Sequence, residues 1–219
     1  MATDRFVNNM SVAIFGGTFN PVHNGHLRIA IELAELLEVD NLRMTPCALP
    51  AHREAPSVSP EQRLEMLKLG IGEQALLQAD DIELRREGPS YTIDTLREIR
   101  VQIGDSTPLY LCVGMDVLAS LDSWRDWQKL TDFCHLIVSS RPGYQIPESG
   151  SLAEWIKARL CDDLPALKKS SAGRLHFCNL TMLAISSTAI RNKISAAEKI
   201  DYLTPAAVVN CIQQQHLYE

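Results

Sequence analysis

The sequence of 219 residues carries a net charge of −6, with 46% hydrophobic and 22% charged residues. This composition is typical of a folded globular chain and argues against a non-specific nucleic-acid binder, because an acidic surface repels phosphate backbones. No apolar run approaches the roughly 18 residues of a membrane span, and the first ten residues lack the apolar segment of a secretory signal. We therefore expect a cytoplasmic protein with neither nucleic acid nor membrane as a partner.

Six short strand-like runs recur along the chain, with segments of helical periodicity between them. The runs cover residues 12–15, 41–45, 76–80, 109–113, 135–139 and 175–179. Such alternation predicts an α/β fold with a doubly wound, mostly parallel sheet that helices cover on both faces. Ser59, Pro60 and Gln62 mark one helix start, because they combine an N-cap, an early proline and a capping-box glutamine. We interpret residues 1–219 as a single domain, with an insertion at about 143–174.

The turn after the first run has the sequence GGTFNPVHNGHL and leads directly into an amphipathic helix. Gly16 and Gly17 allow an anion to approach the backbone, and His23 and His26 add N–H donors that can be cationic. A helix N-terminus at the carboxyl end of a parallel strand also offers free N–H groups and a positive dipole end. The turn is therefore suited to a polyphosphate, although a tight turn with two surface histidines explains the same residues more simply.

Three loops in the middle of the chain carry polar residues of the types that bind nucleotides. PAHREAP contains Arg53, GPSYTIDTL contains Ser90 and Thr92, and GMDVLASLDSW places Asp116 near a helix start. Each has a simpler explanation when taken alone. Arg53 could be a solvated arginine, Ser90 or Thr92 could cap a helix, and Asp116 could be a helix cap.

The motif ISSTAIR near the C-terminus gathers Ser187, Thr188 and Arg191 at the first turn of an expected helix. Hydroxyl groups, free N–H groups and a guanidinium then meet at one helix end, which again suits phosphate. A simple helix cap is the alternative explanation.

Together these motifs resemble those of a known superfamily. GGTFNPVHNGHL is similar to the G-x-F-x-P-x-H-x-G-H signature of the nucleotidyltransferases, and SSTAIR resembles their second phosphate motif. PAHR, GPSYTIDTL, GMDVLASLDSW and HLIVSSRPGY resemble the corresponding segments of bacterial nicotinate mononucleotide adenylyltransferases. The resemblance runs from about Ser11 to about Arg191, and the closing CIQQQHLY fits as well. The sequence departs from this family pattern at two places, and both concern the pyridine pocket. CALPAHR stands where the family has a loop rich in Asn and Pro. Arg125-Asp126 follows Trp124 at a position that varies in the family.

The resemblance implies a Rossmann-like nucleotidyltransferase fold and transfer of AMP from ATP to nicotinate mononucleotide, giving deamido-NAD and pyrophosphate. The catalytic residues that it implies are His26, His23 and Arg53. It implies ATP binding by Gly16, Gly17, Thr18, Phe19, His23, His26, Arg141, Ser187, Thr188 and Arg191, ribose binding by Gly114 and Asp116, and nicotinate binding by Tyr91, Thr92, Trp124 and Arg125.

This reaction needs no general base and no covalent intermediate, because the attacking phosphate oxygen is already ionised at neutral pH. Mg²⁺ is expected to arrive with ATP, held by phosphates and water and without direct protein ligands. The alternative enzyme is an adenylyltransferase for another phosphate ester, such as phosphopantetheine. A catalytically silent nucleotide-binding sensor is the alternative from another class of protein.

The six cysteines, at positions 47, 112, 134, 161, 178 and 211, contain no C-x-x-C pair. Their scatter argues against a disulfide framework and suits a reducing compartment. A zinc site made of His23, His26, Cys47 and His52 matches no common spacing, so no metal ligand is expected among them.

Overall fold

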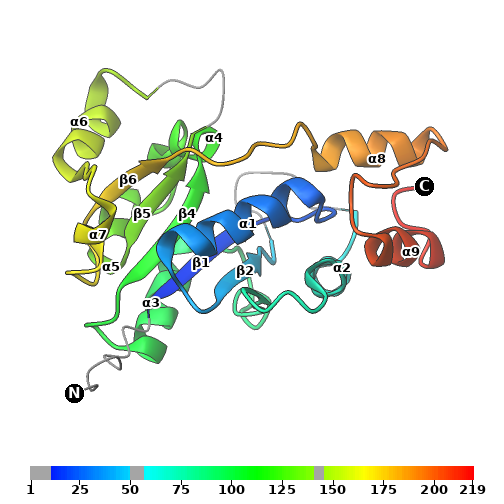
Figure 1. Ribbon diagram of the computed structural model, residues 1–219, viewed down its shortest axis with the longest axis horizontal. Helices are drawn as coiled ribbons and strands as arrows, with labels where there is room; N and C mark the ends of the chain where they lie inside the picture. The colour runs from blue at the N-terminus through cyan, green and yellow to red at the C-terminus, as the bar shows by residue number, and fades with distance from the viewer. Residues whose placement is uncertain (1–10, 50–56, 141–145) are drawn as a thin grey trace, which may run out of the picture.

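The computed structural model describes residues 11–49, 57–140 and 146–219. Within these residues the strands form one six-stranded sheet in the order β3-β2-β1-β4-β5-β6, and every neighbouring pair is parallel (Figure 1). The strands are β1 (Val12–Gly17), β2 (Leu42–Pro46), β3 (Leu77–Ala79), β4 (Leu109–Gly114), β5 (His135–Ser139) and β6 (Leu175–Cys178). The predicted α/β fold with a parallel sheet is confirmed, and each strand overlaps one of the six predicted runs.

The helices lie between the strands and beyond the sheet. They are α1 (Asn24–Leu37), α2 (Pro60–Ile71), α3 (Thr92–Ile103), α4 (Met115–Leu118), α5 (Leu130–Phe133), α6 (Gly150–Arg159), α7 (Leu164–Leu167), α8 (Ser187–Ser195) and α9 (Ala206–Gln214), with 3₁₀ turns η1 (Leu121–Ser123) and η2 (Trp127–Lys129). The predicted start of α2 is confirmed: Ser59 and Gln62 form a reciprocal capping box, which satisfies two free N–H groups. None of the helices in the described residues has the length and apolarity that a membrane crossing needs.

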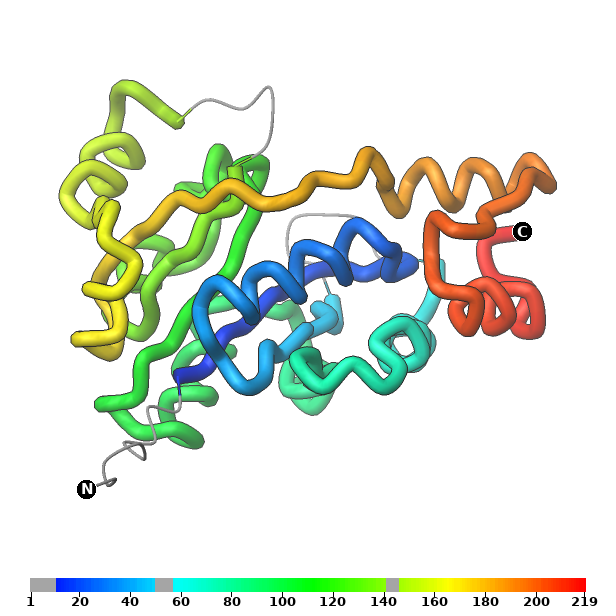
Figure 2. Tube along the Cα trace, viewed as in Figure 1, coloured from blue at the N-terminus to red at the C-terminus, as the bar shows by residue number. Residues whose placement is uncertain are grey.

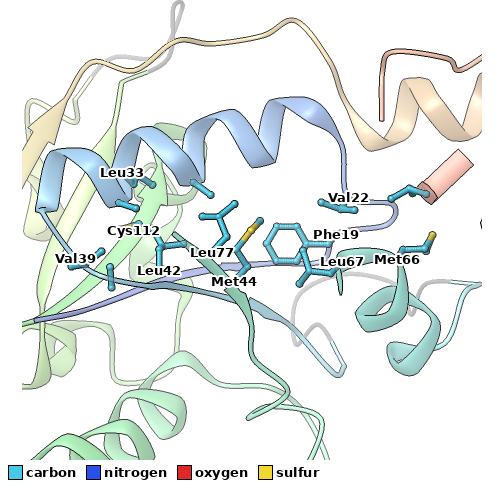
Figure 3. Packing of buried hydrophobic residues seen from close by; sticks show 14 of the residues in the cluster. Phe19, Val22, Leu33, Val39, Leu42, Met44, Met66, Leu67, Leu77 and Cys112 are labelled. Carbon is cyan, nitrogen blue, oxygen red and sulfur yellow. The ribbon is translucent and has the colours of Figure 1, made fainter. Parts of the chain in front are cut away.

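The two faces of the sheet bury different residues, because successive side chains of a strand point in opposite directions. On β4, Tyr110 and Cys112 belong to one core, together with α1 and α9, whereas Leu111 and Val113 belong to a second core with α3 and α6. Figure 3 shows part of the first core, in which Phe19 and Val22 of the first turn lie near Met66 and Leu67 of α2. The turn after β1 is therefore anchored by apolar burial.

The region predicted as an insertion contains α6 and α7, between β5 and β6. Leu152, Trp155 and Ile156 of α6 are buried against the second core, whereas Leu160 remains 42% exposed. The boundaries of the insertion and its place in a single domain stay an interpretation, because residues 141–145 lie outside the described part of the chain.

The strand order reverses between β1 and β4. From β1 the chain builds outward through β2 to β3, and then returns to place β4, β5 and β6 on the other side of β1. Helices that leave neighbouring strands in opposite directions open a crevice at the carboxyl edge, and open α/β sheets bind ligands there. Here the crevice lies beyond Gly17 of β1 and Gly114 of β4.

The segment of the chain after β6 returns to this edge. After β6 an extended segment passes α1, where the Thr181 N–H donates a hydrogen bond of 2.6 Å to Glu32 Oε2, and then enters α8 (Figure 2). The hydroxyl of Thr204 donates to the Val22 carbonyl at 2.8 Å, and the hydroxyl of Tyr218 donates to Asn20 Oδ1 at 2.7 Å. The first turn is thus held in place by residues more than 180 positions away.

Candidate active site

A cavity of about 970 Å³ opens at the reversal of strand order. Two of the predicted site residues, Arg53 and Arg141, lie outside the described residues, as does His52. All the other predicted site residues line this cavity: Gly16, Gly17, Thr18, Phe19, His23, His26, Tyr91, Thr92, Gly114, Asp116, Trp124, Arg125, Ser187, Thr188 and Arg191. The structure therefore brings together motifs that are separated by as many as 175 residues.

The two histidines form a reciprocal capping box at the start of α1. His23 is the N-cap, and its Nδ1 accepts a hydrogen bond of 3.3 Å from the backbone N–H of His26. Nδ1 of His26 in turn accepts from the backbone N–H of His23, also at 3.3 Å. The rings stack with centroids 3.6 Å apart, and the edge of Phe19 packs against His26. Because each Nδ1 is an acceptor, the proton of each neutral ring is on Nε2, which becomes a donor.

The sequence suggested that these rings can be cationic, but the structure favours the neutral form. Burial lowers the pKa of His26 to about 3, with a further contribution from the charge of His23, and burial lowers the pKa of His23 to about 4. At neutral pH the two imidazoles are therefore uncharged N–H donors. Gly25 is part of this arrangement, because a Cβ on it would come within 3.0 Å of the His23 ring.

Helix α8 presents its first turn to the same cavity. Ser186 is its N-cap and accepts from the Ala189 N–H at 3.1 Å, so ISSTAIR does contain a helix cap. The cap leaves the hydroxyl of Thr188 and the guanidinium of Arg191 on the cavity wall. Arg191 Nη1 donates to the Asn20 carbonyl at 2.8 Å, and the Ser187 hydroxyl donates to the Pro21 carbonyl at 2.9 Å. The two phosphate-type motifs are thus directly bonded to each other.

Asp116 lies on the opposite side of the crevice, in the first turn of α4. The N-cap of that helix is Gly114, so Asp116 is not the cap that the sequence allowed as an alternative. A Cβ at position 114 would collide with Oδ1 of Asp116. Glycine at this position therefore leaves the space that the carboxylate occupies. A carboxylate at the end of β4 can accept hydrogen bonds from hydroxyl groups of a ligand.

The aromatic end of the cavity is formed by the start of α3 and by the segment after η1. Trp124 is half-buried, and the guanidinium of Arg125 lies 4.9 Å from the centre of the Tyr91 ring. Helix α3 has no side-chain cap, and the N–H groups of Thr92 and Ile93 have no acceptor among the described residues. Of these two residues, Thr92 lines the cavity, next to Tyr91 and Trp124.

One detail of this end differs from the sequence-based expectation. Neither Ser90 nor Thr92 caps α3; the N-cap is Tyr91, and the Ser90 hydroxyl instead accepts a hydrogen bond of 3.0 Å from the Ala48 N–H. The cap prediction failed because a partner 42 positions away competes for the same hydroxyl. The N–H of Trp124 is already used within its own 3₁₀ turn, where it donates to Leu121 at 3.0 Å.

Comparison with known proteins gives the same assignment as the motifs. A family model described as "Cytidylyltransferase-like" matches residues 14–193. A relative from Psychromonas ingrahamii is 39% identical over 97% of this chain and 99% of its own length, and one from Pseudomonas aeruginosa PAO1 is 41% identical over 94% and 96%. Both carry the name "Probable nicotinate-nucleotide adenylyltransferase". The chain belongs to the nicotinate-nucleotide adenylyltransferase family.

The fold of this family member extends to more distant proteins. Nicotinic acid mononucleotide adenylyltransferase of Plasmodium falciparum, solved in complex with NaAD, superposes with a TM-score of 0.71 at 17% identity, over 95% of this chain and 97% of the other. The same enzyme complexed with APC superposes with a TM-score of 0.69. At this level of identity the likeness concerns the fold, which therefore persists where most side chains differ.

Two further residues of this adenylyltransferase-family site escaped the sequence analysis. Glu83 lines the cavity and accepts a hydrogen bond of 2.7 Å from Thr95, and burial raises the pKa of its carboxyl group. Arg63 of α2 is completely buried behind the cavity wall. A signal for Arg63 was present, since it precedes the buried Met66 and Leu67 by three and four positions and so falls on the apolar face of α2.

The zinc arrangement considered from the sequence cannot be completed within the described residues. Its fourth member, His52, lies outside them. Among the residues that the structure does describe, no group of three His, Cys, Asp or Glu side chains is placed to hold a metal ion. All six cysteines are free, and Cys47 contacts the Thr18 hydroxyl at 3.8 Å.

Proposed function

We propose that this protein transfers the adenylyl group of ATP to nicotinate mononucleotide, giving deamido-NAD and pyrophosphate in NAD biosynthesis. The observation that carries the proposal is a single cavity with two chemically different ends. One end has neutral imidazole donors, a helix N-terminus and Arg191, which suit a triphosphate. The other has aromatic rings and free N–H donors, which suit a pyridine ring with an anionic substituent. Membership of the family supports the same pair of substrates.

The reaction requires alignment more than proton transfer. An ionised oxygen of the nicotinate mononucleotide phosphate forms a bond to the α-phosphorus of ATP. The bond between that phosphorus and the bridging oxygen to the β-phosphate breaks, and pyrophosphate leaves with the electron pair. No proton has to be removed, so the protein contributes by holding two anions in line and by stabilising charge on the α-phosphate.

His26 and His23 are the proposed donors to the α-phosphate. Their capping box fixes both rings, so each Nε2–H is oriented before the substrate binds. A preoriented donor costs little reorganisation when charge develops in the transition state. A phosphate close to the rings would also raise their pKa values from about 3 and 4, which would strengthen these hydrogen bonds.

The remaining phosphate and ribose contacts are assigned by position. Ser187, Thr188 and Arg191 would hold the β- and γ-phosphates that leave as pyrophosphate, and Asp116 would accept from a ribose hydroxyl. Gly16, Gly17, Thr18 and Phe19 would form the floor of the ATP site, and Gly114 would border the ribose. The expectation that Arg53 and Arg141 neutralise phosphates concerns residues outside the described part of the chain.

The acid is the proposed substrate in preference to the amide. The N–H groups of Thr92 and Ile93 offer donors at a positive helix end, and Arg125 adds a cation beside Tyr91. A carboxylate accepts from all of these donors, whereas a carboxamide turns an NH₂ group toward one of them. Each buried group left unpaired costs about 1–3 kcal/mol, so the acid should be preferred by about 10²–10³ in kcat/KM.

Mg²⁺ is proposed to enter as part of the ATP complex. The described residues provide no set of three protein ligands for it, and Asp116 and Glu83 lie in the cavity as separate carboxylates. A triphosphate supplies oxygen ligands of the kind that Mg²⁺ prefers and leaves room for water. Removal of Mg²⁺ by a chelator should therefore suppress turnover without unfolding the protein.

The six free cysteines support a cytoplasmic location for this reaction. Free thiols on four buried and two partly exposed side chains are the state expected where glutathione keeps proteins reduced.

A product assay tests the function directly. Purified protein with Mg²⁺ and ATP is given nicotinate mononucleotide, nicotinamide mononucleotide or phosphopantetheine, and pyrophosphate and the dinucleotide product are measured. We expect turnover with the acid, with kcat/KM higher than with the amide by about 10²–10³. Efficient turnover of phosphopantetheine alone would contradict the proposed acceptor. Equal efficiencies for acid and amide would contradict the donor-rich pocket.

A further inference from the structure

Arg63 of α2 makes three hydrogen bonds to backbone carbonyls that belong to two different loops. Nη1 donates to the Thr18 carbonyl at 2.8 Å, and Nη2 donates to the carbonyls of Cys47 and Ala48 at 2.7 and 3.0 Å. The side chain is 0% exposed. Thr18 belongs to the turn after β1, and Cys47 and Ala48 follow β2. One guanidinium therefore fixes the distance between two loops that form one wall of the cavity.

The same contacts continue to the pyridine end of the site. The Ala48 N–H donates to the Ser90 hydroxyl at 3.0 Å, and the Ser90 N–H donates to the Leu49 carbonyl, also at 3.0 Å. Ser90 immediately precedes Tyr91 and Thr92 at the start of α3. A continuous chain of hydrogen bonds thus runs from the phosphate turn, through Arg63 and residues 47–49, to the donors proposed for the nicotinate ring.

Arg63 is hydrogen-bonded to no carboxylate among the described residues, although its charge adds to the hydrogen bonds that lower the pKa of Glu61 on the same helix. Its partners are carbonyl oxygens, and it takes part in no ion pair within the described part of the chain. Its buried Nε has no hydrogen-bond partner there either. Burying a cation without a hydrogen-bonded anion costs free energy of folding. A buried arginine of this kind is expected where its hydrogen bonds serve the structure or the function of the site. Phosphates bound at the turn that contains Thr18 would place further negative charge near this guanidinium.

We propose that Arg63 is a positioning residue for adenylyl transfer, which holds the phosphate turn and the start of α3 at the separation needed for in-line attack and places a fixed positive charge behind the bound phosphates. The proposal rests on the proposed function, because it assigns the two ends of the cavity to ATP and nicotinate mononucleotide. It predicts that loss of the guanidinium fork affects both substrates at once, although Arg63 touches neither.

The test compares Arg63→Lys with a matched control, Arg100→Lys. Arg100 is also buried, and its guanidinium donates to the carbonyls of Phe133, Gly104, Thr107 and Ser171. It belongs to the last turn of α3, and it is not among the residues that line the cavity. Lysine keeps the charge in both variants but lacks the rigid planar fork with which arginine reaches carbonyls on separate loops. Both substitutions should lower the melting temperature, so the difference between them isolates the effect on the site.

Three quantities are measured for each variant: kcat with ATP and nicotinate mononucleotide, KM for each substrate, and the calorimetric affinity for inorganic tripolyphosphate. For Arg63→Lys we expect kcat to fall by about 10²-fold, since a displacement of about 1 Å between reactants has that effect. Tripolyphosphate affinity should fall about 10-fold, as the charge is no longer held behind Thr18. For Arg100→Lys, kinetic constants per folded molecule should stay within about twofold, as for substitutions distant from the site.

The proposal is overturned if Arg63→Lys keeps wild-type kinetics and affinity, or if Arg100→Lys changes them equally. Absence of wild-type turnover would contradict the proposed function, and the tripolyphosphate measurement would still decide the role of Arg63. If Arg63→Lys does not fold, Ser90→Ala replaces it, because this variant breaks the link at Ala48 only. A several-fold rise in KM for nicotinate mononucleotide at unchanged tripolyphosphate affinity supports the chain of contacts, and an unchanged KM overturns it.

Discussion

Lowering the pH from 7.5 to 5 should destabilise this protein specifically through His23 and His26. In the folded state their pKa values are about 4 and about 3, because burial disfavours the charged imidazoles. In the unfolded chain both return to about 6.5. Between these values the unfolded state binds more protons than the folded state, so the free energy of unfolding decreases as the pH falls below about 6.5. At pH 7.5 both states are uncharged and the contribution is fully present.

The size of the effect follows from the difference between the pH and the unfolded pKa. One pKa unit corresponds to about 1.4 kcal/mol, so at pH 5 each imidazole that stays neutral in the folded state costs about 2 kcal/mol. The pair should therefore reduce the free energy of unfolding by up to about 4 kcal/mol. This is a large part of the 5–15 kcal/mol that stabilises an ordinary domain. Burial also lowers the pKa of His135, which therefore contributes in the same direction, and a variant is needed to separate it.

The variant is His23→Asn combined with His26→Gln. Asparagine is a favourable N-cap and glutamine is the usual capping-box residue at the third helical position, so the start of α1 keeps its hydrogen bonds and loses both titrating groups. Urea unfolding of wild type and variant at pH 7.5, 6 and 5 gives the free energies. We expect the variant to lose about 2–4 kcal/mol less than wild type between pH 7.5 and 5. Equal losses would refute the assignment of neutral, buried histidines.

Three other predictions concern activity. His26→Ala should lower kcat by about 10²–10³ with KM for ATP within several-fold, because a transition-state donor is lost; a steady-state assay with a near-wild-type kcat would remove His26 from the mechanism. Arg191→Ala should weaken ATP binding by about 1.5–3 kcal/mol, measured by calorimetry, because a charge-assisted hydrogen bond is lost; unchanged affinity would leave ISSTAIR as a helix cap only. Replacing the six cysteines in groups by serine or alanine should preserve turnover, and inactivity of a well-folded variant, or stoichiometric zinc in the purified protein, would contradict their structural role.

Much of the site was predictable from the sequence because its motifs are local. GGTFNPVHNGHL places a glycine-rich turn, an N-cap and a helix start within twelve residues, and ISSTAIR does the same for α8. The six strands were predictable as short runs between segments of helical periodicity, and the clearest of them, β4, is buried at five of its six positions. The site residues that the resemblance implied, apart from Arg53 and Arg141 outside the described residues, all line one cavity in the structure.

The sequence alone could not show which contacts hold these motifs at the distances that they have in the folded protein. The spacing in α2 places Arg63 on the apolar face, but only the fold shows that it is hydrogen-bonded to three carbonyls of two loops. Ser90 lies next to the start of α3, yet its hydroxyl accepts a hydrogen bond from the Ala48 N–H and does not cap the helix. From the sequence, His23 and His26 could be neutral or cationic. Burial lowers the pKa of both imidazoles, so both are neutral at pH 7.

The sequence by itself therefore determined which strands and helices form and which residues can meet a nucleotide, because hydrophobic periodicity and helix capping act within a few turns of the chain. The tertiary structure decided burial, and with it the pKa values, the competition between hydrogen-bond partners and the separation of the two ends of the cavity. These properties depend on groups such as Tyr218 and Asn20, which are 198 positions apart and meet only in the folded chain. Desolvation and long-range hydrogen bonds arise only once the whole chain has packed.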